Sequence, residues 1–183
     1  MKIDYYRKNI LISLISEYAY IEKKITLPSG KESSYYINCK KLLSFPKNTM
    51  VVGDLLWVAL RDYDPDAVGA IELRAVTLLG LINYFGYRTF IIRKEKDHEI
   101  NSEIEGAIME SDKRVVILED VITTGRTVLN AIAKLKKKYP NIEEIKVISI
   151  FDKQEGVKRI TEKGYLAESL VTAIELFRHN RKK

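Results

Sequence analysis

Short, nearly continuous apolar runs recur through the second half of the chain. They lie at residues 67–71, 89–92, 115–118 and 145–151. Helix-like segments separate them at about 74–85 and 127–138. Apolar runs of this length are typical of strands that are buried on both faces, and their alternation with helices indicates a parallel sheet. The pattern therefore predicts an α/β fold with an open, mostly parallel sheet and flanking helices.

The N-terminal part of the chain follows a different pattern. Residues 4–19 carry apolar side chains at helical spacing, which predicts an amphipathic helix. The segment ITLPSGKESSYYIN predicts a hairpin whose turn lies at Pro28-Ser29-Gly30. Asn48 or Thr49 is expected to cap a helix that runs to about Arg61. We interpret about 1–45 and the C-terminal segment as a small hood on a single domain that spans residues 1–183.

One segment lacks both patterns. Residues 94–112 are charged and contain few large apolar side chains. A long polar loop inside a compact α/β domain is usually functional or disordered. We expect residues 96–107 to be poorly ordered without a ligand and to become protected when one binds.

Composition narrows the class of protein. The chain carries 31 Lys+Arg against 25 Asp+Glu, a net charge of +6, which gives a mild attraction to anions but does not decide function. Cys39 is the single cysteine, which fits a reducing compartment. The N-terminus MKIDYYRKNI has charges where a signal peptide needs an apolar core, and no apolar run approaches about 20 residues. We therefore expect a cytoplasmic protein without a membrane span.

The candidate chemistry lies in VVILEDVITTGRTV, residues 115–128, where a buried strand meets two carboxylates and then a turn. In an open α/β sheet, ligands bind at the carboxyl ends of the strands. Backbone N–H groups and hydroxyls of the following segment form a phosphate cradle, supplied by Thr123, Thr124, Gly125, Arg126 and Thr127. Carboxylates repel a phosphate, so Glu119 and Asp120 need another partner, such as a ribose diol. This order favours a ribose 5-phosphate ligand; the alternative is an acidic strand end and a helix cap without a ligand.

The same residues resemble a known family. EDVITTGRT resembles the phosphoribosyl-diphosphate (PRPP) signature of type I phosphoribosyltransferases. Three further segments resemble orotate phosphoribosyltransferases: ITLPSGKESSYYIN their hood, AIELRAVTL their pyrophosphate loop and IIRKEKDHE the start of their catalytic loop. The matches keep their order from about residue 25 to 156. The resemblance implies an enzyme of pyrimidine synthesis that converts PRPP and orotate into orotidine 5′-monophosphate and diphosphate.

The resemblance also implies roles for individual residues. Glu119 and Asp120 would bind the ribose hydroxyls, and residues 123–127 the 5-phosphate. The cations that would neutralise the diphosphate are Arg74, Arg93, Lys94, Lys96 and His98. The base would meet Lys153, Tyr35, Tyr36 and Lys31, although aromatic residues in a hairpin are more often core. Magnesium would be bound mostly through substrate oxygens and water, with Asp120 reaching it through water. A homodimer that shares loop 93–107 between its subunits is also implied.

The chain departs from the family pattern at three positions. The catalytic loop is one residue shorter between Lys94 and His98, and Glu99 replaces a usual glycine. Lys153 stands where an arginine usually grips the orotate carboxylate, and a point charge suits a carboxylate less well than a planar fork. Two alternatives therefore stay open: a phosphoribosyltransferase for another base, or a catalytically weakened PRPP- or nucleotide-binding regulator. No DNA-binding or RNA-binding motif is evident, so nucleic acid is the least favoured partner.

Overall fold

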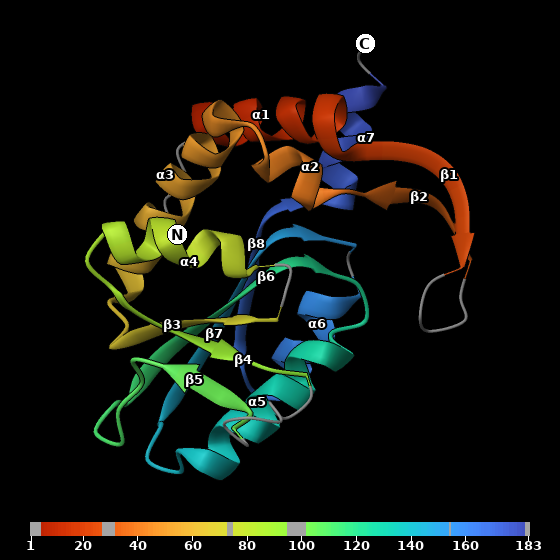
Figure 1. The fold of residues 1–183 in the computed structure, drawn as a ribbon. Helices are drawn as coiled ribbons and strands as arrows, with labels where there is room; N and C mark the ends of the chain where they lie inside the picture. The colour runs from red at the N-terminus through yellow and green to blue at the C-terminus, as the bar shows by residue number, and fades with distance from the viewer. Residues whose placement is uncertain (1–4, 27–31, 73–74, 95–101, 154, 182–183) are drawn as a thin grey trace.

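The computed structural model describes residues 5–26, 32–72, 75–94, 102–153 and 155–181. The described part of the chain forms a six-stranded sheet and a separate two-stranded ribbon (Figure 1). The large sheet contains, in spatial order, β5 (Ile104–Gly106), β4 (Arg88–Ile92), β3 (Ala67–Ile71), β6 (Arg114–Ile122), β7 (Glu144–Asp152) and β8 (Leu166–Thr172). Its strands are parallel except β5, which pairs with β4 in the antiparallel direction. The predicted open, mostly parallel α/β sheet is confirmed.

Helices cover both faces of the sheet. Successive residues of the central strands point to opposite faces, and both sets are apolar, so both faces must be covered. Val116 and Leu118 of β6 belong to a core shared with α1 (Tyr5–Leu14), α3 (Pro46–Tyr63), α4 (Val76–Tyr84) and α7 (Ala173–Asn180). Val115 and Ile117 belong to a second core shared with α5 (Arg126–Lys138) and α6 (Gly156–Glu162). Each core is closed by one layer of helices, which gives a three-layer arrangement.

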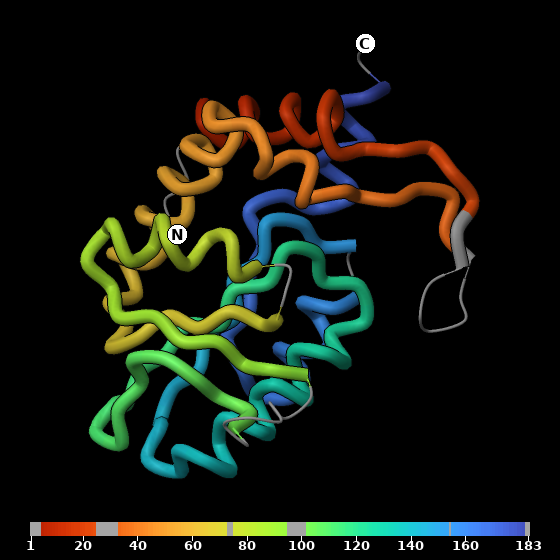
Figure 2. The backbone as a smooth tube through the Cα atoms, viewed as in Figure 1, coloured from red at the N-terminus to blue at the C-terminus, as the bar shows by residue number. Residues whose placement is uncertain are grey.

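The hood lies at the end of the sheet where β6 and β7 finish (Figures 1 and 2). It contains α1, a π-helical turn at Ile15–Ala19, the ribbon of β1 (Tyr20–Thr26) and β2 (Glu32–Ile37), and α2 (Cys39–Leu43). The C-terminal helix α7 lies beside α1, and Lys8 Nζ is 2.6 Å from Glu175 Oε1 between them. The predicted hairpin is confirmed by the antiparallel pairing of β1 and β2, and its predicted turn lies outside the described residues.

Three sequence-based expectations about local structure are wrong. The helix expected to be capped by Asn48 or Thr49 begins at Pro46, because proline suits the first helical turn and its missing N–H needs no partner there. The strand expected at 115–118 continues to Ile122, so the acidic pair lies within β6. Residues 104–106, expected to belong to a loop without regular structure, form β5, and Ile104 is buried.

Candidate active site

The acidic pair lies at the point where neighbouring strands leave the sheet centre in opposite directions. From β3 the chain continues to β4 on one side, whereas β6 is followed by β7 on the other. Pairing between β3 and β6 ends at Ala70 and Leu118, but β6 stays paired with β7 as far as Ile122 and Asp152. A reversal of this kind opens a crevice at the carboxyl ends of the strands, which is where ligands bind in open α/β sheets.

Glu119 and Asp120 are buried, with 7% and 4% of their surfaces exposed. The Val121 N–H donates to Asp120 Oδ1 at 2.8 Å, and the Asp120 N–H donates to Glu119 Oε1 at 3.3 Å. Cys39 Sγ at the start of α2 lies 3.8 Å from the Asp120 carbonyl oxygen. Backbone donors therefore hold two carboxylates in place, where burial without partners would be costly.

The segment after the acidic pair leads directly into α5. Thr123 and Thr124 are half-buried, Gly125 is buried, and Arg126 and Thr127 are exposed in the first turn of the helix. Gly125 has φ of 72°, a left-handed conformation that glycine adopts without steric cost. No side chain caps the N-terminus of α5, so its first N–H groups face the position predicted for a phosphate.

Helix α6 packs against the loop of residues 123–125. A Cβ atom on Gly125 would lie 3.0 Å from the Gly156 carbonyl oxygen, and one on Gly156 would lie 2.0 Å from Ile122 Cγ2. Arg159 Nη1 donates to the Thr124 carbonyl oxygen at 3.2 Å. Sequence reasoning did not find Arg159, because a contact between segments this far apart leaves no local pattern.

Lys153 connects the end of β7 to the hood. Its N–H donates to the Ile122 carbonyl oxygen at 3.0 Å, which places it beside the end of β6. Its Nζ donates to Ser33 Oγ and to the Tyr35 carbonyl oxygen, both at 3.1 Å, and lies 4.2 Å from the centre of the Tyr35 ring. Burial lowers the pKa of Lys153. The structure therefore brings two predicted base-binding residues together and adds Ser33.

Tyr35 and Tyr36 occupy different environments on β2. Tyr35 is half-buried, stacks on Tyr20 at 5.9 Å and meets Phe177 of α7 edge-on at 5.1 Å. Burial raises the pKa of Tyr35 to about 12, and the nearby Tyr20 and Asp152 add to the shift. Tyr36 is exposed. Tyr35 thus packs between Tyr20 and Phe177 within the hood.

Arg93 is engaged by two carboxylates. Its Nε and Nη2 donate to the carboxylate of Glu105, with 3.2 Å between Nη2 and Oε2, and its Nη1 lies 3.3 Å from Glu72 Oε1. Glu72 directly follows β3, within the segment that resembles a pyrophosphate loop, and Glu105 lies on β5. One positive charge thus faces two negative ones, an arrangement that sequence reasoning missed because both acids lie elsewhere in the chain.

Of the other predicted cations, the structure describes only Lys94, whose side chain is exposed. Lys31, Arg74, Lys96 and His98 lie outside the described residues, as does Glu99. Within the described ranges, no group of three or more His, Cys, Asp or Glu side chains is arranged to hold a metal ion. In the same ranges, no helix has the length and apolar character that crossing a membrane requires.

Comparisons with known proteins agree with this geometry. The profile of the phosphoribosyl transferase domain family matches residues 38–177. An orotate phosphoribosyltransferase from Nostoc sp. is 34% identical over 174 residues, which cover 91% of this chain and 83% of that protein. One from Pyrococcus furiosus is 38% identical over 156 residues, which cover 82% of this chain and 84% of that protein.

A solved structure shares the fold. The structure of Mycobacterium tuberculosis orotate phosphoribosyltransferase in complex with PRPP superposes with a TM-score of 0.74 at 23% identity, and the match covers 93% of this chain and 98% of that one. The family profile spans the sheet and the acidic pair, and the relatives match most of their length. The chain therefore belongs to the phosphoribosyl transferase family, and the Nostoc sp. and Pyrococcus furiosus relatives within that family are orotate phosphoribosyltransferases.

Proposed function

We propose that the protein is an enzyme that transfers the 5-phosphoribosyl group of PRPP to orotate, giving orotidine 5′-monophosphate and diphosphate in pyrimidine synthesis. The observation that carries this proposal is the buried pair Glu119–Asp120 at the crevice between β3 and β6, followed at once by the uncapped N-terminus of α5. Relatives named for orotate do not favour another base or a regulator.

In this proposal each part of the loop binds one part of PRPP. The carboxylates of Glu119 and Asp120 accept hydrogen bonds from the ribose hydroxyls, which a charged acceptor binds more strongly than a neutral one. The 5-phosphate lies on the N–H groups of residues 123–127, where the helix dipole also favours an anion. The support of this loop by Gly156 and Arg159 keeps those donors in place before the ligand arrives.

The leaving diphosphate requires positive charge. We assign Lys94, with Arg74, Lys96 and His98, to the neutralisation of the diphosphate. Arg93 is placed at the edge of the diphosphate site. Carboxylate oxygen atoms are ligands that suit magnesium, so Asp120 fits contact with this ion through water. When bound, magnesium supplies further charge neutralisation for the diphosphate. The protein residues orient the sugar between the acidic pair and the phosphate loop.

The base is assigned to the junction between β7 and the hood. Two of the three ammonium donors of Lys153 already bind Ser33 and Tyr35, and one remains for the orotate carboxylate. Burial lowers the pKa of Lys153, so the site disfavours an isolated positive charge and gains from a nearby anion. Lys31 is the second candidate for the carboxylate.

The direct test follows the loss of orotate absorbance with PRPP and magnesium, beside uracil and purine bases. Conversion of orotate with a kcat/KM well above that of every other base supports the proposal. Turnover of a different base would establish another specificity. PRPP binding without turnover of any base would identify a regulator.

We further propose that the protein is a homodimer. An exposed aromatic patch supports this: Trp57 of α3 and Tyr84, which is 85% exposed, both lie against Phe85, with ring centres 6.4 and 6.0 Å away. A contiguous exposed apolar surface is typical of an interaction site. Sedimentation should find a dimer that Tyr84→Glu dissociates, whereas Leu166→Glu, at another exposed apolar residue, leaves it intact. An unchanged dimer in Tyr84→Glu would place the interface elsewhere.

The dimer is proposed to share residues 93–107 between subunits. If a segment of one subunit completes the site of the other, a subunit inactivated at Lys94 should regain activity when mixed with one inactivated at Asp120. No recovery in verified mixed dimers would show that each subunit uses its own segment. A cytoplasmic location, supported by the single Cys39 and testable by cell fractionation, completes the proposal.

A further inference from the structure

One lysine of α5 holds both chain segments that flank residues 95–101. Lys134 Nζ donates to the carbonyl oxygens of Arg93 at 3.0 Å and Lys94 at 2.7 Å, on the N-terminal side of that segment. The same atom lies 2.9 Å from Glu103 Oε1 on the C-terminal side. An ammonium group has three donors, and these three acceptors match them in number.

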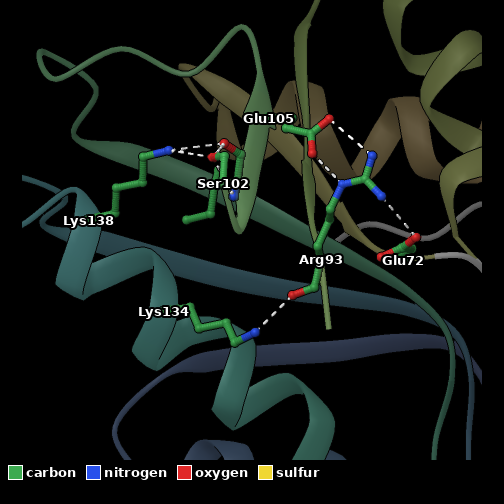
Figure 3. A network of polar contacts seen from close by, with 7 residues as sticks. Glu72, Arg93, Ser102, Glu105, Lys134 and Lys138 are labelled. Atoms are coloured by element: carbon green, nitrogen blue, oxygen red, sulfur yellow. Dashed lines mark hydrogen bonds and ion pairs between the residues drawn. The ribbon is translucent and has the colours of Figure 1, made fainter. Parts of the chain in front are cut away.

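A second lysine, Lys138, lies one turn further along α5. It contacts only the flank that follows residues 95–101. Lys138 Nζ donates to Ser102 Oγ at 3.0 Å and to the Ile104 carbonyl oxygen at 3.1 Å (Figure 3). The two flanks also join directly, because the Arg93 N–H donates to the Glu103 carbonyl oxygen at 2.8 Å. Figure 3 shows Lys134 and Lys138 reaching from one face of α5 toward β5 and Arg93.

The opposite end of α5 is the phosphate loop. Lys134 lies eight residues after Arg126, which corresponds to about 12 Å along a rigid helix. A helix of this kind fixes the distance between its N-terminus and any group attached further along it. The same element therefore sets where the 5-phosphate is bound and where the segment that carries the proposed diphosphate ligands is attached.

We propose that Lys134 is a positioning residue for phosphoribosyl transfer: it clamps Arg93, Lys94 and Glu103 to α5 and so fixes the cations beside the diphosphate relative to the 5-phosphate loop. This inference rests on the proposed function. Lys134 does not touch the substrate; it holds the backbone from which Lys94 projects. A displaced Lys94 lowers the rate of the chemical step, because charge stabilisation depends on donors placed before the reaction begins.

The test compares Lys134→Met, which keeps most of the length of the side chain without its donors, with Lys134→Arg, which keeps charge and donors. Lys137→Met is the matched control, because Lys137 is exposed on the same helix. In the full-length protein, Lys134→Met should lower kcat about tenfold with less than a twofold change in KM for orotate. Lys134→Arg should restore most of the loss, and Lys137→Met should behave as wild type.

Hydrogen exchange supplies a second measurement that does not depend on turnover. The amide hydrogens of residues 103–105 should exchange faster in Lys134→Met than in Lys137→Met, while those of β6 and β7 stay unchanged. Wild-type kcat in Lys134→Met, or no rescue by Lys134→Arg, would overturn the positioning role. If Lys134→Met does not fold, Lys134→Gln, which removes the charge and shortens the side chain, is compared with Lys134→Arg instead. If the wild type does not convert orotate, the proposed function fails, and unchanged exchange at 103–105 would separately overturn the clamp.

Discussion

Replacing Gly125 with alanine perturbs the proposed phosphate loop where it packs against α6. The residue has φ of 72°, and a non-glycine residue in this left-handed region costs roughly 1–2 kcal/mol. The new Cβ would also lie 3.0 Å from the Gly156 carbonyl oxygen and 3.1 Å from Ile160 Cγ1. Backbone and a buried side chain must move by a few tenths of an ångström, so the phosphate loop and α6 separate.

The consequence for binding follows from the donors of the loop. Moving the N–H groups of residues 123–127 away from the 5-phosphate weakens at least one hydrogen bond to a charged group, which contributes about 1.5–3 kcal/mol. Since about 1.4 kcal/mol corresponds to a factor of ten, KM for PRPP should rise about 10-fold to 100-fold. KM for orotate should change little, because Lys153 and Ser33 lie on other elements.

The control is Gly164→Ala. Gly164 has φ of 86°, but a Cβ atom there would meet no heavy atom within 4 Å, so this variant carries the backbone strain without the collision. Both variants should lose stability, by about 2–4 °C in Tm for each kcal/mol in a chain of this size. Steady-state kinetics and thermal unfolding are measured on both. A wild-type KM for PRPP in Gly125→Ala, beside a Tm loss equal to that of Gly164→Ala, would refute the assignment of this loop to the phosphate.

Three further predictions concern the acidic pair, the base and the hood. Glu119→Gln combined with Asp120→Asn should lower kcat/KM at least about a hundredfold while the far-ultraviolet circular dichroism stays native, because the new amide keeps an oxygen that accepts from Val121 but loses the charge; near-normal PRPP kinetics would exclude the ribose assignment. Lys153→Arg should lower KM for orotate more than KM for PRPP, by about 1 kcal/mol, since a planar guanidinium suits a carboxylate better than a point charge. If Lys153→Arg leaves orotate kinetics unchanged and the wild type already rejects uracil, the carboxylate-binding role would pass to Lys31. The pKa of Tyr35 is raised from 10.0 to about 12, so between these values the unfolded chain loses the phenol proton before the folded one and stability falls as pH rises. Tyr35→Phe should remove part of that fall in denaturant titrations above pH 10, and identical pH slopes would contradict it.

The part of the fold that depends on local pattern was predictable. The runs at 67–71, 89–92, 115–118 and 145–151 all became strands, since the interior of a sheet covered on both faces buries short, continuous apolar stretches. The edge strands escaped notice. β5 has three residues, and β8 contains Glu168, whose carboxylate pairs with Lys146 at 2.7 Å. A strand at an edge carries charges and mixed burial, so its sequence lacks the run that identifies an interior strand.

The candidate site divides in the same way. Glu119, Asp120 and residues 123–127 follow one another along the chain, so their chemistry could be interpreted from the sequence. Contacts that cross the fold could not: Arg159 reaches Thr124, and Lys153 reaches Ser33, through the packing of separate elements. A sequence shows that a charge is present, whereas its partner is chosen by the tertiary structure.

Arg93 shows why that choice matters for the mechanism. Its sequence position beside Lys94 suggested a direct contact with the diphosphate, yet its guanidinium faces Glu72 and Glu105. The two carboxylates offset the positive charge of Arg93, so its guanidinium adds little positive charge beside a diphosphate. The positive charge nearest in sequence is Lys94. Its side chain is exposed, and its backbone carbonyl oxygen accepts a hydrogen bond from Lys134 Nζ. The ion pairs of Arg93 therefore tie the end of β3 to β5. Under the proposed function, we expect the charge for the leaving group to come from Lys94, from magnesium and from the other proposed cations.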